Sequence, residues 1–98
     1  MDVYHLKNMT MVEEGILSII FVESWFQEEI DMLVGIVMAR MIGSGIIEHL
    51  QGADRESIRF NWDGHFFVLN FEYYSQSCWI ESESSQGQHL LTTLQITN

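Results

Sequence analysis

The chain has no proline, one cysteine and only four basic residues, and each shortage excludes a class of protein. Because Cys78 is alone, it cannot form an intramolecular disulfide, which excludes a disulfide-stabilised scaffold and favours a reducing, cytoplasmic setting. Four basic against 14 acidic residues give a formal net charge of −10, which opposes binding to nucleic acid phosphates and to anionic membranes. No apolar run approaches the roughly 20 residues that span a bilayer, and the first residues lack the basic start and apolar core of a secretory signal.

The composition that remains is that of a folded domain. Hydrophobic residues make up 47% of the 98 positions, which is too many for a disordered tail. We find no internal repeat and no linker, so we expect residues 1–98 to form one domain.

The strongest local signal is a β-hairpin centred on Asp63-Gly64. This dipeptide is preferred in two-residue type I′ turns, and it lies between two runs rich in aromatic and β-branched residues, Ser57–Trp62 and His65–Phe71. The turn fixes the register, so that Trp62 faces His65, Phe60 faces Phe67 and Ile58 faces Leu69. One face of the hairpin then carries Ile58, Phe60, Trp62, Phe67, Leu69 and Phe71.

A third strand is expected after a four-residue loop at positions 73–76. This spacing places Cys78 opposite Phe71 and Ile80 opposite Leu69, both on the buried face. The second face of the resulting three-stranded meander carries Phe66, Val68, Trp79, Glu81 and Glu83.

Upstream, the sequence predicts one long helix over Trp25 to Ile42. Ser24 and Gln27 have the spacing of a capping box, and Gly43 is the glycine expected just beyond a helix end. The helix is apolar on more than one side, which indicates a core helix.

The chain before this helix predicts a second hairpin. Ile16 to Val22 is typical of a buried strand, and Gly15 can turn it back onto a weaker strand over Val3 to Val12.

Three further segments are less defined. Ile46 to Leu50 fits either a short strand or a turn of helix, and Gln51 to Glu56 is expected to be a polar loop. Leucines at helical spacing, behind the cap region Ser84-Ser85, favour a short helix over Gln88 to Ile96, although threonines at 92 and 93 also allow a strand.

These elements predict an α+β fold, a two-layer sandwich. In it an antiparallel sheet, made of the N-terminal strand or hairpin and the C-terminal three-stranded meander, packs on one long central helix, with a short C-terminal helix.

The sequence contains no motif of catalysis or cofactor binding. It lacks a phosphate-binding loop, a dinucleotide fingerprint, a nucleophile elbow and a calcium loop. The histidines at positions 5, 49, 65 and 89 share no recognised ligand spacing, and the neighbours Glu48 and His49 point apart on a strand. Inward placement makes Cys78 an inert core cysteine. We therefore expect no enzyme, no catalytic residues, no cofactor and no metal site.

A candidate interaction patch is the feature that remains. Exposed aromatic residues with a charged rim are typical of protein-binding surfaces. The alternative is that the N-terminal hairpin or the C-terminal segment covers these side chains within the monomer. The patch consists of Arg59, Phe66, Val68, Tyr73, Tyr74 and Trp79.

Part of this region resembles a known family. The stretches Trp62-Asp63-Gly64, Asn70-Phe71-Glu72-Tyr73-Tyr74-Ser75 and Cys78-Trp79-Ile80-Glu81 are similar to a family of small bacterial proteins of about this length, catalogued as a domain of unknown function. The resemblance implies no activity, cofactor or site. The acidic balance and the order of elements are also loosely similar to type III secretion chaperones, which are usually longer and begin with a helix.

Three functional hypotheses follow. The first is a small, acidic, cytoplasmic and non-catalytic module that binds another protein, or a second copy of itself as a homodimer. This hypothesis expects no binding to nucleic acid or to a membrane. The second is an acidic mimic of nucleic acid, or a binder similar to a secretion chaperone. The third is a small hydrolase that uses Cys78 or a pair of histidine and carboxylate, which requires Cys78 to be exposed near a histidine.

Overall fold

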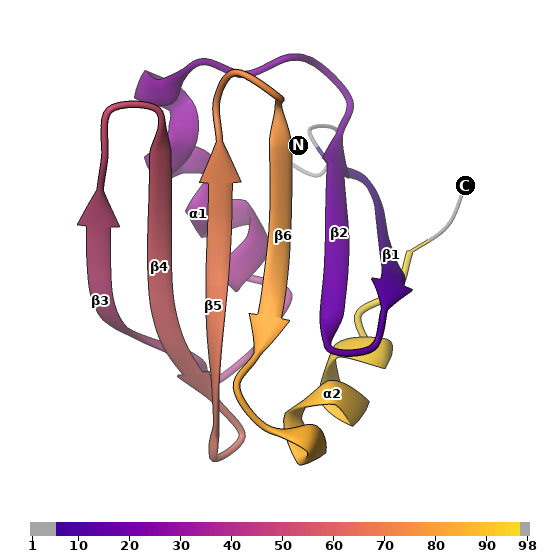
Figure 1. Ribbon diagram of the computed structural model, residues 1–98. Coiled ribbons are helices and arrows are strands. Elements are labelled where there is room, and N and C mark those ends of the chain that lie inside the picture. Colours follow the sequence, from indigo (N-terminus) through magenta and orange to yellow (C-terminus); the bar gives the residue numbers. More distant parts are fainter. Residues whose placement is uncertain (1–5, 97–98) are drawn as a thin grey trace.

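Six antiparallel strands form a single sheet, in the spatial order β1-β2-β6-β5-β4-β3 (Figure 1). The computed structural model describes residues 6–96. Two short helices and one 3₁₀ turn accompany the sheet. The elements are β1 (Leu6–Glu13), β2 (Ile16–Phe21), the 3₁₀ turn η2 (Gln27–Glu29), α1 (Ile30–Met38), β3 (Gly45–Gln51), β4 (Arg55–Trp62), β5 (His65–Glu72), β6 (Ser77–Ser82) and α2 (Ser85–Thr92).

The predicted hairpin around Asp63-Gly64 is confirmed as β4 and β5. Both turn residues have positive φ, 53° and 81°, as a type I′ turn requires. Trp62 pairs with His65, and the pairing continues in the predicted register to the other end of both strands. The rings of Phe60 and Phe67 therefore stack on the buried face, with centroids 5.4 Å apart.

The third strand of the meander is also confirmed. Residues 73–76 form the turn, and β6 pairs Cys78 with Phe71 and Ile80 with Leu69. Cys78 and Ile80 are 3% and 0% exposed, respectively, so this strand continues the buried face of the hairpin.

The N-terminal hairpin forms β1 and β2, and Gly15 has the left-handed conformation, φ +80°, that its place in the turn predicts. The part of the predicted first strand at positions 3–5 lies outside the described residues. β2 pairs with β6, which joins this hairpin to the meander and completes the sheet.

The prediction of one long helix over Trp25–Ile42 is wrong, because α1 has only nine residues. The Ser24–Gln27 capping box is not formed; instead the Glu29 carboxylate accepts a hydrogen bond of 2.9 Å from the Phe26 amide. Trp25 is held in loop conformation by Gln76, which hydrogen-bonds both its amide and its carbonyl at 2.9 Å. Its ring packs edge-on against the Phe71 ring, with centroids 5.5 Å apart, so Trp25 is part of the core although it lies before the first residue of the helix.

At its other end α1 tightens and stops. The amides of Arg40 and Met41 bond to carbonyls three residues back, and Gly43 follows with φ +87°. These three-residue bonds are typical of the last turn of a helix. Gly43 has the left-handed conformation that was predicted, but α1 ends at Met38 with Ala39 as its C-cap, so Gly43 lies in the following loop and its predicted place directly after the helix is wrong.

The less defined segments now have definite structures. Ile46–Leu50 belongs to strand β3, so the expected polar loop over Gln51–Glu56 is wrong and only a short turn separates β3 from β4. The predicted C-terminal helix exists as α2, but it covers Ser85–Thr92 and not 88–96 as predicted. Its first turn is capped by the Ser84 side chain, the acceptor for the Gly87 amide. Beyond the helix, Ile96 makes an isolated antiparallel bridge to Met9 of β1.

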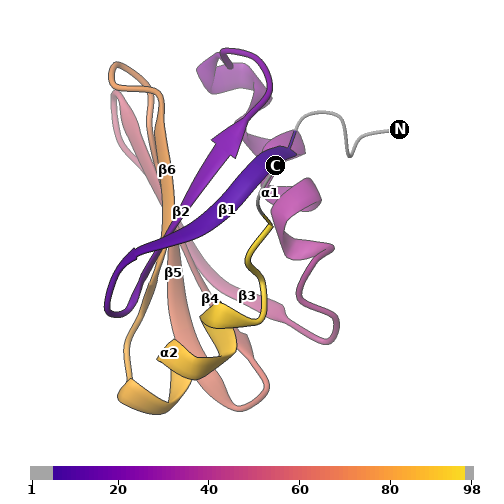
Figure 2. The same cartoon turned by 90° about the vertical axis from the view of Figure 1, so that its right-hand side faces the viewer.

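One face of the sheet holds the core, and the helices pack there. Buried residues of α1, such as Leu33 and Val37, meet the inward side chains of the strands, and Leu91 of α2 joins the same cluster. Figure 2 shows α1 on this side of the sheet, while no helix covers the opposite side in the described chain. Two short helices at different ends therefore replace the single central helix of the predicted fold class, and that prediction is corrected.

Neither helix in residues 6–96 has the length and apolar character needed to cross a membrane.

Two helical glycines give a matched test of this packing. A Cβ on Gly87 of α2 would collide with Ser82 Oγ and come within 3.2 Å of the Phe67 ring. Ser82 Oγ cannot easily withdraw, because it donates to the Ser84 carbonyl and accepts from the Ser84 amide. We expect Gly87→Ala to lower the free energy of unfolding by about 1–3 kcal/mol, the usual cost of overpacking. Denaturant unfolding measures this change.

Gly35→Ala is the control, because a Cβ at this position of α1 meets nothing within 4 Å. It should leave stability unchanged or raise it by up to about 1 kcal/mol through helix propensity. Equal effects of the two substitutions would show that α2 does not pack as described.

Candidate functional site

The predicted interaction patch divides into two groups. Arg59, Phe66, Val68 and Trp79 lie on the face of the sheet opposite to the core, where Val68 pairs with Arg59. Tyr73 and Tyr74 lie instead in the turn between β5 and β6, close to Trp25. Tyr73 is half-buried with its ring 6.2 Å from that of Trp25, whereas Tyr74 is 80% exposed. The six residues therefore do not form one patch.

The aromatic residues of the open face are covered in part by two arginines of β4. The Arg59 guanidinium lies 4.6 Å above the Phe66 ring, and that of Arg55 lies 5.5 Å from the Trp79 ring. Such contacts are favourable for an arginine over an aromatic face. Single arginine side chains therefore cover part of this face, and residues of the N-terminal hairpin, among them Ile16 and Ser18, lie close to Trp79.

The polar groups of this face are also engaged. Arg59 donates two hydrogen bonds of 3.0 Å to Glu83, and these bonds lower the pKa of the Glu83 carboxyl group. Asn70 is only 6% exposed; its amide donates to Glu81 and accepts from the Ser57 hydroxyl. The carboxylates of Glu81 and Glu83 are therefore both engaged in side-chain pairs on this face.

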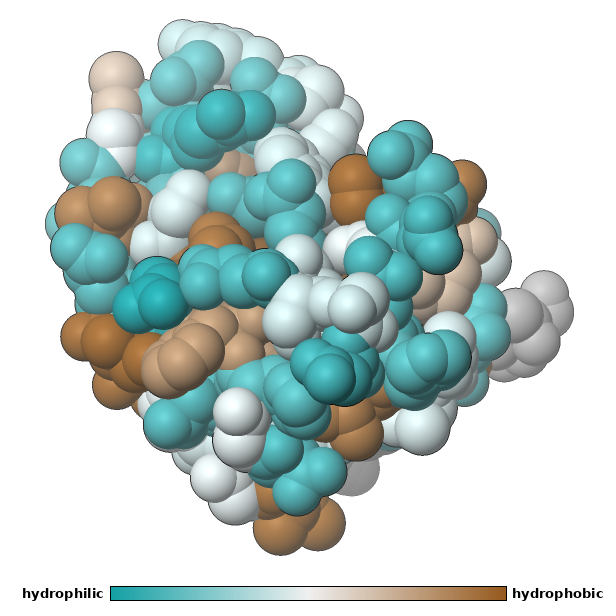
Figure 3. Space-filling model, turned by 60° about the horizontal axis from the view of Figure 1, so that its bottom comes forward, coloured by the Kyte–Doolittle hydropathy of each residue, from teal (hydrophilic) through white to brown (hydrophobic). Residues whose placement is uncertain are grey.

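The strand β3 presents a different kind of surface. It forms one edge of the sheet, and all seven of its residues are exposed. Ile46, Ile47 and Leu50 are 55%, 47% and 59% exposed, which is high for large apolar side chains. In the space-filling view, apolar groups lie along the left-hand side of the molecule, the side on which Figure 1 places β3 (Figure 3). An apolar edge of this kind is a template for a further strand.

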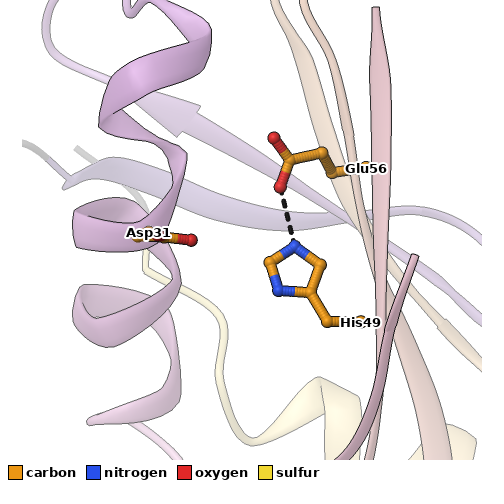
Figure 4. Close-up of side chains that lie close together, drawn as sticks. All are labelled: Asp31, His49 and Glu56. Carbon is orange, nitrogen blue, oxygen red and sulfur yellow. Dashed lines mark hydrogen bonds and ion pairs between the residues drawn. The ribbon is translucent and has the colours of Figure 1, made fainter. Parts of the chain in front are cut away.

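A second cluster lies between α1 and the start of β4. Asp31, His49 and Glu56 each offer a ligand atom, and these three atoms lie within 4.8 Å of one another (Figure 4). His49 Nε2 is 2.7 Å from a Glu56 carboxylate oxygen. Glu56 is only 5% exposed, and carboxylates are rarely buried to this extent unless they are paired. Its only side-chain partner in the described chain is His49.

The sequence predictions missed this cluster because they placed Glu56 in a loop. The missing signal was the alternation of β4: counting back two positions from Ile58 puts Glu56 on the inward face. The sequence analysis considered His49 only together with its chain neighbour Glu48. In the structure the partner of His49 is Glu56, which lies on the neighbouring strand β4. His65 and His89 lie in other elements, and His5 is outside the described residues.

Cys78 is buried, as predicted, and burial raises the pKa of its thiol well above the usual range. The form of the hydrolase hypothesis that uses Cys78 required an exposed thiol near a histidine, and the burial of Cys78 argues against that form alone. We expect a thiol reagent at neutral pH to leave the native protein unlabelled and to label one thiol per chain after denaturation, because the thiolate is the reactive form. Mass spectrometry of both samples checks this; rapid labelling of the native chain would contradict the buried register of β6.

The comparisons with known proteins give a family without a function. No curated protein and no solved structure matches the chain. A family model described as a protein of unknown function, DUF3630, matches residues 9–96, which is nearly the whole sequence. The chain therefore belongs to the DUF3630 family.

Proposed function

We propose that the protein is a non-catalytic, cytoplasmic interaction module that binds an extended segment of another protein as a further strand beside β3. The observation that carries this proposal is the exposure of all seven β3 residues on an unpaired edge. Strand addition uses the free backbone groups of such an edge for affinity and alternate side chains for selectivity.

The opposite edge of the sheet supports this choice by contrast. β1 is partly covered by the chain itself, since Met9 exchanges two backbone hydrogen bonds with Ile96, and the Met11 amide donates to Gln95. Register irregularities make an edge a poorer template; β1 carries two of them and β3 carries one, between Ile46 and Glu48. In residues 6–96, no segment pairs in this way with the outer edge of β3.

The charge of the chain favours a basic partner. A net charge of −10 attracts cationic segments and repels a second copy of the same chain. Among the few cations, Arg55 and Arg59 are already placed over aromatic rings on the open face. Glu48, exposed on β3 itself, adds a carboxylate to the edge. We therefore infer that the bound segment alternates apolar residues and is flanked by lysine or arginine.

The other hypotheses receive less support. A mimic of nucleic acid needs its carboxylates in one array, but Glu14 lies in the β1–β2 turn, Glu28 lies before α1 and Asp63 lies in the β4–β5 turn. A hydrolase based on Cys78 lacks an accessible thiol. The same acidic surface is unfavourable for phosphates of nucleic acids or lipids, which supports a protein as the partner.

A synthetic peptide tests the proposal directly. The probe is a fluorescent peptide with alternating valine and threonine, flanked by lysine pairs. The control peptide has the same central sequence but is flanked by glutamate pairs. We expect saturable binding of the lysine peptide by fluorescence anisotropy, and binding of the glutamate peptide that is weaker by about tenfold or more. Leu50→Asn should weaken binding by about fivefold, because it removes apolar contact at the edge.

Val12→Asn is the matched control. Val12 is 62% exposed on β1 and Leu50 is 59% exposed on β3, so the two substitutions cost the fold similarly little. Val12→Asn should bind the lysine peptide as the wild type does. Absence of binding by the wild type, or equal binding by both variants, would contradict the proposal. So would a wild-type dimer in sedimentation experiments that Leu50→Asn converts to a monomer, because a second copy would then occupy the edge.

A further inference from the structure

We propose that Asp31, His49 and Glu56 form a binding site for one divalent transition-metal ion, with Zn²⁺ as the best match to the donor set. The three side chains come from α1, β3 and β4, respectively, and all point into one space between the helix and the sheet (Figure 4). Their ligand atoms already lie within 4.8 Å of one another.

The distances are close to those of a bound state. Zinc ligands at about 2.1 Å from a tetrahedral ion lie about 3.4 Å from one another. His49 Nε2 and the Glu56 oxygen are 2.7 Å apart and share a hydrogen-bonding proton, so to admit an ion these two donors need to separate and the proton has to move to Nδ1 of His49 or to solvent. Asp31 is exposed on α1 and already points toward the other two side chains, so its carboxylate needs to approach them only from within 4.8 Å (Figure 4).

The charge of the cluster favours a cation. Asp31 and Glu56 bring two carboxyl groups close together beside the His49 ring, and a divalent ion balances carboxylate charge. Arg55 and Arg59 cannot do so, since both lie over aromatic rings on the opposite face of the sheet. Repulsion between close carboxylates is relieved when a cation binds between them.

Glu56 has spare capacity to bind such an ion. An ionised carboxylate offers about four lone-pair positions, yet in the described chain Glu56 accepts a hydrogen bond only from His49. Its side chain is 6% exposed, so bulk water does not replace the missing partners well. A buried and under-coordinated carboxylate next to an imidazole is the arrangement that a metal ion completes.

The donor types select the class of metal. Imidazole nitrogen with two carboxylates suits zinc and its neighbours in the first transition row, whereas Ca²⁺ and Mg²⁺ prefer oxygen ligands alone. Three protein ligands leave one coordination position for water. The His49 side chain is 32% exposed, so the ion can enter from solvent.

Zinc titration of the full chain tests the site. Competition with a chromophoric chelator should show one Zn²⁺ bound per chain, and Asp31→Asn should weaken binding by about tenfold or more, through loss of one ligand. Glu28→Gln and His89→Gln remove an acid and a histidine elsewhere on the surface and should bind as the wild type does. Co²⁺ gives a second readout, because bound Co²⁺ in a four- or five-coordinate site absorbs visible light strongly.

Asp31→Asn is the deciding variant, because Asp31 is exposed and its loss leaves the His49–Glu56 pair and the fold intact. His49→Gln should abolish the Co²⁺ absorption, with circular dichroism as the check on folding. Equal Zn²⁺ affinity of Asp31→Asn and the wild type would overturn the proposal. So would loss of affinity in His89→Gln, which would place the ion elsewhere. Leu50→Asn should bind Zn²⁺ normally, so the metal site and strand addition can fail independently.

Discussion

The two-residue turn at Asp63-Gly64 sets the register on which the rest of the molecule depends. Because both residues adopt positive φ, Trp62 must face His65, and every second residue of β4 and β5 then points to the same side. A slip by one position would expose Phe60 and Phe67 and bury the polar series. Because β6 pairs with β5 and β3 pairs with β4, the same division between inward and outward side chains continues into these two strands. The same register turns Glu56 inward, so one turn determines both the apolar core and the buried carboxylate.

The second constraint is that the helices cover only one face. α1 and α2 are short, and both pack on the core side, so the opposite face has to be stabilised by the strands alone. On this face polar side chains contact and partly cover the apolar ones. Arg59 lies over Phe66 and Arg55 over Trp79, while the Asn70 side chain bridges Ser57 and Glu81. These pairings satisfy the centre of the open face. They reach β3 only through the attraction between Arg59 and Glu48, and the exposed isoleucines and leucine of β3 lie beside unpaired backbone.

What could be predicted from the sequence was local in the chain. The Asp63-Gly64 turn, the Tyr73–Gln76 turn and Gly15 each fix a hairpin through nearby residues, and those predictions were confirmed. The length of α1 could not be predicted in this way, because its start depends on hydrogen bonds between Trp25 and Gln76, 51 positions apart. The strand β3 was undecided because its apolar residues fit two periodicities. The cluster of Asp31, His49 and Glu56 depends on both of these unpredicted elements, because it needs strand β3 beside β4 and helix α1 packed over them.

The β2–β6 ladder has a consequence for how the chain reaches this fold. The other neighbouring strands are joined by tight turns, but β2 and β6 are about sixty positions apart and pair at only three places, Ile16 with Glu81, Leu17 with Ile80 and Ser18 with Trp79. Closing so long a loop is entropically costly, so the β3–β6 meander and the β1–β2 hairpin can each form before they meet. The same short ladder is where the native sheet opens most readily, and opening there would separate the β1–β2 hairpin from the β3–β6 meander, each still paired within itself.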